Sequence, residues 1–161
     1  MPKSEKFKSR FVKLIEPLNA NSVQIAKMIG TTTQTVCDAR YYGMYPSVYG
    51  AMRIADYFNV SLDYLLGLTD DDTFVKSENP VTFGERLRQL REAKPSSNIR
   101  IDTKVNPVVI KAWESANRFP LKWRHLFSFA EFYDVSFDYL LCRTDKHNEI
   151  FTYLSTKSSR A

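Results

Sequence analysis

Apolar side chains recur along the chain at intervals of three and four residues, the spacing that places them on one face of an α-helix. The first such stripe consists of Phe7, Phe11, Leu14, Ile15 and Leu18. Strict alternation of apolar and polar residues, which is typical of a half-buried strand, is scarce throughout. The pattern therefore predicts an all-α fold made of short helices.

Glycine, proline and short polar residues divide the first seventy residues into five predicted helices. The residues expected to begin or end these helices are Ser4, Pro17, Asn21 or Ser22, Gly30, Thr32, Gly43, Pro46, Ser47 and Ser61. Gly30 and Gly43 are the expected stops, because glycine accepts the positive φ that follows a helix C-terminus. The third helix is expected to begin at Thr32 and to run to about Tyr41.

The chain repeats itself with an offset of 75 residues. The segment 60–66, VSLDYLL, recurs as 135–141, VSFDYLL, and Thr-Asp follows soon after each copy. Each repeat opens with a phenylalanine and a basic amphipathic stretch, at Phe7 and at Phe83. An internal repeat of this length indicates that one structural unit has been duplicated.

The repeat predicts two units, residues 1–70 and 83–145. A polar, proline-containing linker at 71–82 joins them, and a tail at 146–161 follows. Unit 2 is expected to contain the same five helices, with Ile99 and Ile101 in a shortened second helix. Its expected boundary residues are Thr82 with Glu85 as a capping box, Asn106, Pro107, Pro120 and Ser136.

The second and third helices carry a recognisable pattern. Residues 21–36, NSVQIAKMIGTTTQTV, resemble the helix-turn-helix of the Cro and lambdoid-repressor family, the XRE class. Unit 2 resembles the same family through residues 83–92, FGERLRQLRE, and through Trp113-Glu114. The repeated VSxDYLL stretch looks like the last helix of many members. The resemblance implies two tandem five-helix lambda-repressor-like helix-turn-helix domains, which bind double-stranded DNA through their third helices.

Carried over residue by residue, the resemblance implies a DNA-reading surface in unit 1. Thr33 and Gln34 would face base edges at the start of the recognition helix, with Asp38 one turn later on the same face. The start of the second helix would hold a phosphate through its amides and short polar side chains. The complete set of expected DNA-binding residues is Asn21, Ser22, Thr32, Thr33, Gln34, Asp38, Tyr42 and Lys111.

Other interpretations of these residues stay open from the sequence. Thr33 and Gln34 are also ordinary solvated residues of a helix start. Tyr41, Tyr42 and Tyr45 follow the recognition helix, and they either contact phosphates through their hydroxyls or form partly buried aromatic surface. Cys37, in the same helix, is expected to be an inert side chain near the exposed face.

The two units depart from the family pattern in opposite ways. Arg91 and Glu114 stand in unit 2 where the family usually keeps an ion pair between its first and third helices, whereas unit 1 has Ile15 and Arg40 there. The reading positions of unit 2 are apolar, and among the neighbouring side chains Lys111 is the one expected to reach a phosphate. We therefore expect unit 2 to keep the fold and to read little sequence, providing non-specific phosphate contact or an interaction surface. The reading positions concerned are Pro107, Val108 and Ala112.

A row of arginines follows the start of unit 2. Arg86, Arg88 and Arg91 recur along its first helix, and their simplest interpretation is a solvated helix face, with Arg91 committed to Glu114. The formal net charge of +5 and the pI of about 9.2 favour a polyanionic partner only mildly, and the charge divides almost evenly between the units.

No catalytic or metal-binding pattern is present. The two cysteines, Cys37 and Cys142, are far apart, and the two histidines, His125 and His147, have no neighbouring cysteine or carboxylate pattern. We therefore expect no enzyme, no metal and no cofactor. The first ten residues lack the apolar core of a signal peptide, and no apolar run approaches the roughly 20 residues of a membrane span. A cytoplasmic location is expected.

Two functional hypotheses follow. The first is a transcriptional regulator of bacterial or phage type that binds DNA sequence-specifically. The alternative is a protein-interaction module, antirepressor-like or antitoxin-like, that keeps the fold without strong sequence reading. Either the flexible linker makes the chain an intramolecular pseudo-dimer, or two chains pair through their fifth helices, where we expect Tyr64, Leu65, Tyr139 and Leu140 to be exposed. The apolar residues of the tail, such as Phe151, either dock on unit 2, pair with another copy or fray.

Overall fold

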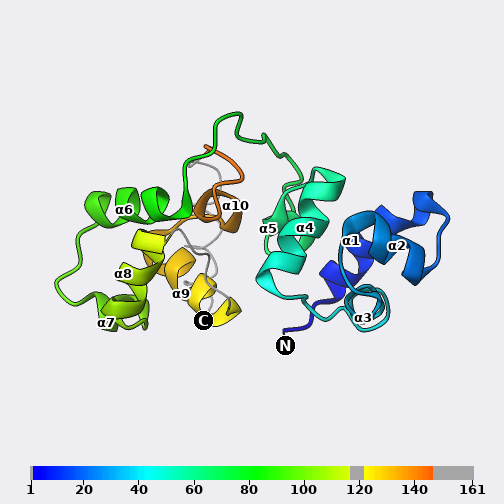
Figure 1. The fold of residues 1–161 in the computed structure, drawn as a ribbon, viewed down its shortest axis with the longest axis horizontal. Helices are drawn as coiled ribbons and strands as arrows, with labels where there is room; N and C mark the ends of the chain where they lie inside the picture. Colours follow the sequence, from blue (N-terminus) through cyan, green and yellow to red (C-terminus); the bar gives the residue numbers. More distant parts are fainter. Residues whose placement is uncertain (1, 117–121, 147–161) are drawn as a thin grey trace. The chain divides into compact units, whose positions relative to one another are not determined.

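The computed structural model describes residues 2–116 and 122–146 of the chain. It divides into two compact units, Met1–Phe74 and Val75–Ala161, and the boundary falls inside the segment 71–82. Every regular element within the described residues is a helix, apart from one isolated bridge between Lys3 and Met44 (Figure 1). The prediction of an all-α fold is confirmed. None of the described helices has the length and apolar character that a membrane span requires.

Unit 1 contains α1 (Glu5–Ile15), the 3₁₀ turn η1 (Glu16–Leu18), α2 (Ser22–Ile29), α3 (Thr33–Cys37), η2 (Asp38–Tyr42), α4 (Val48–Phe58) and α5 (Leu62–Leu65). Serine and threonine side chains cap the helices where the sequence predicts them, because each accepts a hydrogen bond from an amide of the first turn. These caps are Ser4, Thr32, Ser47 and Ser61. Gly30 and Gly43 both take positive φ after the helices that they end.

The third helix differs from its prediction. The α-helical part ends at Cys37, and η2 continues as a π-helical turn instead of further α-helix to Tyr41. The turn η2 packs on α1, and its Ala39 is fully buried. Gly43 approaches α1 so closely that a Cβ there would lie 2.6 Å from the carbonyl oxygen of Ser4. The π-helical turn ends at Gly43, and we infer that its wider geometry allows this close approach of Gly43 to Ser4.

Unit 2 contains α6 (Phe83–Ala93), α7 (Ile99–Thr103), α8 (Pro107–Ala116), α9 (Trp123–Tyr133) and α10 (Phe137–Leu140). Thr82 caps α6 by accepting from the Glu85 amide, which is the threonine half of the predicted capping box. Asn106 and Ser136 cap α8 and α10. The predicted role of Pro120 lies outside the described residues.

Aromatic rings fill the core of unit 2. Trp113 on α8 lies 5.5 Å from Phe129 and 6.5 Å from Phe83, measured between ring centroids. His125 on α9 lies 5.5 Å from the same tryptophan, and burial lowers its pKa, with Arg124 and Lys122 lowering it further. In unit 1 the place of Trp113 belongs to the small Ala39, so the two cores are packed differently.

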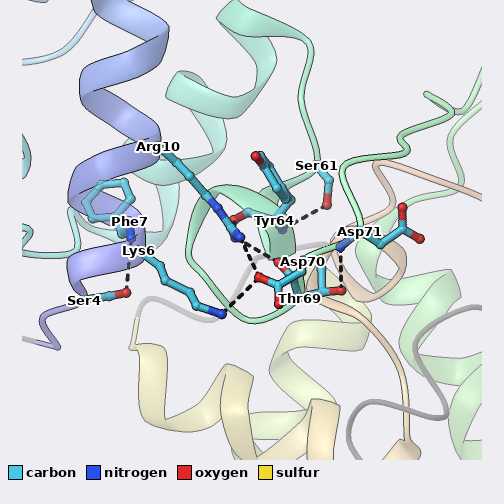
Figure 2. Close-up of polar contacts among 9 residues, drawn as sticks. All are labelled: Ser4, Lys6, Phe7, Arg10, Ser61, Tyr64, Thr69, Asp70 and Asp71. Atoms are coloured by element: carbon cyan, nitrogen blue, oxygen red, sulfur yellow. Dashed lines mark hydrogen bonds and ion pairs between the residues drawn. The ribbon is translucent and has the colours of Figure 1, made fainter.

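Each unit ties its first helix to the end of its last helix through one arginine. Figure 2 shows this contact in unit 1. The Arg10 guanidinium lies 3.9 Å from the Tyr64 ring centroid and pairs with Asp70 at 2.8 Å. Lys6 also pairs with Asp70, at 3.0 Å, and the hydrogen bonds from Lys6 and Arg10 lower the pKa of that carboxyl group. We call this set, Arg10, Tyr64 and Asp70, the arginine clamp of unit 1.

Unit 2 repeats the clamp. The Arg86 guanidinium lies 3.9 Å from the Tyr139 ring centroid and 3.4 Å from the Asp145 carboxylate. The side chain of Arg86 is only 5% exposed, so the prediction that it belongs to a solvated face is wrong for this residue. Its equivalence to Arg10 was available from the repeat. Arg86 follows Phe83 by three residues, as Arg10 follows Phe7, and Tyr139 and Asp145 stand 75 residues after Tyr64 and Asp70. Arg88 and Arg91 are exposed.

The last helices do not present the surface expected for pairing of two chains. Leu65 on α5 and Leu140 on α10 are fully buried. Tyr64 and Tyr139 are half-buried beneath the arginines of the clamps. The prediction that these four residues are exposed is therefore wrong, because the leucines belong to the core and the tyrosine rings are covered by guanidinium groups.

The segment between the units is less free than a flexible linker of the predicted length. The Ser77 amide donates to the Arg143 carbonyl at 2.9 Å, and the Ser77 hydroxyl donates to Asp145 at 2.7 Å. Thr144 donates to the Val75 carbonyl at 2.8 Å. These bonds fasten Val75–Ser77 to the end of unit 2, and they leave Asp71–Phe74 as the connection proper.

We expect Arg86→Ala to destabilise unit 2 by about 2 kcal/mol, because it removes a desolvated cation–π contact and a buried side-chain stem. Arg88→Ala, which changes an exposed arginine of the same helix, is the matched control and should alter the unfolding free energy by less than about 0.5 kcal/mol. Chemical denaturation monitored by tryptophan fluorescence measures both, since both tryptophans, Trp113 and Trp123, lie in unit 2. Equal effects of the two substitutions would show that Arg86 is not a core contact.

We expect the stability of unit 2 to fall as pH is lowered from about 7.5 to 5.5. The folded-state pKa of His125 is depressed, so in this range the unfolded chain binds a proton that the folded chain resists. This contribution is complete above the ordinary histidine pKa and is lost as pH falls through the folded value. Denaturation midpoints of the wild type and His125→Gln across this range provide the measurement. A slope that is unchanged in the variant would contradict the assignment.

Candidate nucleic-acid interface

In unit 1, α2 and α3 pack against each other across the turn formed by residues 30–32 (Figure 1). The Thr32 hydroxyl accepts from the Thr35 amide at 3.1 Å and lies 2.8 Å from the Thr35 hydroxyl, which fixes the start of α3. Arg53 reaches over from α4 and donates to the Gly30 carbonyl at 2.8 Å. The turn is thus held from both sides, and the angle between α2 and α3 is fixed by these bonds and by the core beneath them.

The start of α2 is built by a reciprocal capping box. The Asn21 side chain accepts from the Gln24 amide at 2.9 Å, and the Gln24 side chain accepts from the Asn21 amide at 3.0 Å. The carboxamide oxygen of Asn21 is therefore engaged in the cap instead of being free for a phosphate. What this helix start offers to an anion is the remaining amides of its first turn, which have no acceptor inside the helix, and the half-buried hydroxyl of Ser22.

The exposed face of α3 is polar. Thr33 and Gln34 are both exposed, as the resemblance implies. The Gln34 amide group donates to the Asp38 carboxylate at 2.8 Å across the junction of α3 and η2. This bond orients the glutamine side chain, and it leaves the second amide hydrogen and the carbonyl oxygen of Gln34 available to a ligand. Asp38 itself is half-buried.

Arg40 brings a positive charge to the start of α2. Its guanidinium lies 3.5 Å from the Ser22 hydroxyl oxygen and 5.7 Å from the centroid of the Tyr41 ring. Within residues 2–116 and 122–146 it has no carboxylate partner. Lysine and arginine charges that are not neutralised internally are the groups that contact phosphates. From the sequence, Arg40 was identified only as the residue that replaces the acidic partner of the family's ion pair.

Unit 2 contains the ion pair that unit 1 lacks. Arg91 Nε lies 2.8 Å from Glu114 Oε1, and the hydrogen bond to that carboxylate raises the pKa of Arg91. The pair between the first and third helices is therefore confirmed in unit 2. In unit 1 the corresponding Ile15 is buried, and Arg40 turns toward the start of α2 instead.

An open groove of about 720 Å³ lies where the ion pair is missing in unit 1. It runs from the end of α1 past η1 to the start of α2. The residues that line it are Val12, Ile15, Glu16, Asn19, Ala20, Asn21, Ser22, Arg40 and Tyr41. The groove therefore places a mainly polar lining, an aromatic ring and an uncompensated guanidinium beside the candidate phosphate site.

The tyrosines after α3 separate into two kinds. Tyr41 and Tyr42 are 55% and 61% exposed, so their hydroxyls are accessible to a ligand. Tyr45 is buried, its ring packs edge-on against Phe7, and its hydroxyl donates to the Leu66 carbonyl. Of the two alternatives left open for Tyr45, phosphate contact is therefore wrong and buried aromatic packing is confirmed. Cys37 is half-buried, close to the exposed face.

The corresponding surface of unit 2 is apolar. Pro107, Val108 and Ala112 are exposed on α8, and Lys111 is the exposed cation beside them. These side chains offer no hydrogen-bonding group at the positions where unit 1 offers Thr33 and Gln34. Of the predicted DNA-binding residues, those in unit 1 lie around one helix pair, and Lys111 lies in the other unit.

The described residues contain no group of three or more histidine, cysteine, aspartate or glutamate side chains arranged to hold a metal ion. Cys142 is buried, and burial raises the pKa of its thiol, which favours the unreactive form. No family model, no curated protein and no solved structure matches the chain.

We expect Asn21→Ala to lower the unfolding free energy of unit 1 by about 1 kcal/mol, because it breaks the capping box of α2. Ser22→Ala should change it much less, since the long contact from Arg40 is the only hydrogen bond that the Ser22 side chain makes with the described residues. Thermal unfolding followed by circular dichroism compares the two. If both variants lost a similar amount of unfolding free energy, the assignment of Asn21 as the structural cap and Ser22 as an accessible side chain would be wrong.

Proposed function

We propose that unit 1 is a helix-turn-helix domain that binds double-stranded DNA sequence-specifically, with α3 in the major groove, and that the protein regulates transcription. The observation that carries this proposal is the exposed polar start of α3, Thr33 and Gln34, beside an α2 start that carries the unpaired charge of Arg40. Base readout and phosphate contact need these two features side by side.

The phosphate contact falls at the start of α2. First-turn amides point toward an anion there, and the positive end of the helix dipole favours negative charge. Ser22 supplies a hydroxyl and Arg40 a guanidinium, 3.5 Å apart. Tyr41 and Tyr42 extend this surface with exposed hydroxyl groups. Such contacts position the protein on DNA and carry no sequence information themselves.

The base contact falls to Gln34, supported by Asp38. A glutamine carboxamide reads adenine through its N6 and N7 groups, using one donor and one acceptor. The bond to Asp38 occupies one amide hydrogen and leaves that donor and acceptor pair intact. Thr33 adds a hydroxyl and a methyl group at the neighbouring position.

The second unit serves a different role in this proposal. Both units share the order of helices and the arginine clamp, so we assign both to the same helix-turn-helix class. Unit 2 lacks the polar reading positions, which favours the alternative function of protein interaction for that unit alone. The chain would then combine one DNA-reading domain with one domain that has kept the fold for another purpose.

The decisive experiment is selection of bound duplexes from a random DNA pool at about 150 mM salt. Wild type and Gln89→Ala, which changes an exposed glutamine of unit 2, should enrich the same motif. Gln34→Ala should relax one position of it at a cost of about 1–3 kcal/mol. Arg40→Ala should weaken binding to all sequences alike and reduce the salt dependence by about one phosphate contact.

Two results would overturn the proposal. One is the absence of any enriched motif, with only weak salt-labile binding. The other is an enriched motif that Gln34→Ala leaves intact at every position, because base readout would then lie elsewhere. Circular dichroism spectra of the variants serve as the folding control, and none of the substituted side chains is buried.

A further inference from the structure

The start of α8 exposes an apolar strip where unit 1 exposes polar side chains. Val108 is 73% exposed and Val109 is 36% exposed, with Pro107 and Ala112 also exposed. Val108 and Ala112 are four residues apart and therefore lie on the same helix face. We call these four residues the α8 strip. Ile101 on the preceding helix α7 is 71% exposed as well.

The α8 strip is poorly suited to DNA bases. Its side chains donate and accept no hydrogen bonds, so the polar edges of base pairs would be desolvated without compensation. Exposed apolar residues are ordinary when they are scattered. Here three of them are consecutive at the start of one helix and Ala112 follows one turn later, while the core of unit 2 is already filled by Ile110 and Trp113 of that same helix.

Positive charges outnumber negative charges around the strip. Arg100, Lys104 and Lys111 are exposed on α7, between the helices and on α8. Of the carboxylates nearby, Glu114 pairs with Arg91, whereas the exposed Asp102 accepts from the neutral Ser96 hydroxyl. An approaching ligand therefore meets apolar side chains flanked by cations.

We propose that the α8 strip docks an amphipathic segment of another protein, in which apolar side chains are flanked by carboxylates. A helix that presents such a face buries its apolar side chains on the strip and pairs its acidic residues with Lys104 and Lys111. The tail of this chain fits the strip poorly by charge, since residues 146–161 contain three basic residues and one acidic residue. The proposal concerns unit 2 and stands independently of DNA binding by unit 1.

The test is a selection of displayed helical peptides on the full chain, followed by anisotropy measurements with the best synthetic peptide. The enriched peptides should combine apolar residues with aspartate or glutamate. Val108→Asp should weaken their binding at least about tenfold, because it places a like charge at the centre of the site. Lys111→Glu should weaken them as well and should improve binding of the same peptide with its acids changed to lysine.

Val23→Asp is the matched control, since Val23 is an exposed valine of α2 in unit 1, and it should leave peptide binding unchanged. Val108→Asp is not expected to unfold unit 2, because an acidic residue is favourable in the first turn of a helix. Its thermal unfolding is measured alongside. The Gln34→Ala variant should also bind the peptide normally, which separates this proposal from the function of unit 1.

Several results would overturn the proposal. One is a selection without enrichment, or with peptides that lack acidic residues. Another is peptide binding that Val108→Asp leaves intact. A third is self-association in sedimentation experiments that Val108→Asp abolishes, which would assign the strip to a second copy of the chain. A fourth is a DNA motif whose recognition is lost in Val108→Asp, which would assign it to nucleic acid.

Discussion

In both units an arginine of the first helix covers a tyrosine of the last helix and reaches the aspartate just beyond it. Units of this size bury a limited core, so a contact that joins the two ends of the helical sequence has a large effect on the whole. Because α1 also packs on η2, the clamp of Arg10 fixes the helix that supports the end of α3. Presentation of the exposed face of α3, which we propose reads DNA, therefore depends on a contact on a different part of α1.

Local chemistry made much of this fold predictable. The caps at Ser4, Thr32 and Ser61 follow from side chains that satisfy amides within the same turn. The π-helical turn of η2 was not predictable, because hydrophobic spacing does not distinguish it from an α-helix over so few residues. Burial of Arg86 was missed for a different reason. A charged residue on a helix is usually solvated, and only tertiary contacts reveal that a tyrosine and an aspartate enclose this one.

In the candidate site, too, local sequence predicts some features and tertiary contacts determine the others. Exposure of Gln34 follows from its place on α3 opposite the buried Val36, which periodicity identifies, and Thr33 is exposed at the first residue of the helix. The role of Asn21 in the capping box was also predictable, because a glutamine stands three residues later. Burial of Tyr45 and the orientation of Arg40 depend on helices distant in sequence. Their environments are therefore properties of the folded unit and not of the local segment.

The hydrogen bonds of Val75 and Ser77 carry a consequence for how the two units act together. Asp70 is held on one side and Val75 on the other, so the intervening stretch Asp71–Phe74 extends to at most about 14 Å. A short tether of this kind keeps the second unit at a high effective concentration near anything that the first unit has bound, on the order of millimolar. Cleavage of this stretch would remove that advantage while leaving the helices of both units intact, so the length of the connection is itself a determinant of how the two units act together.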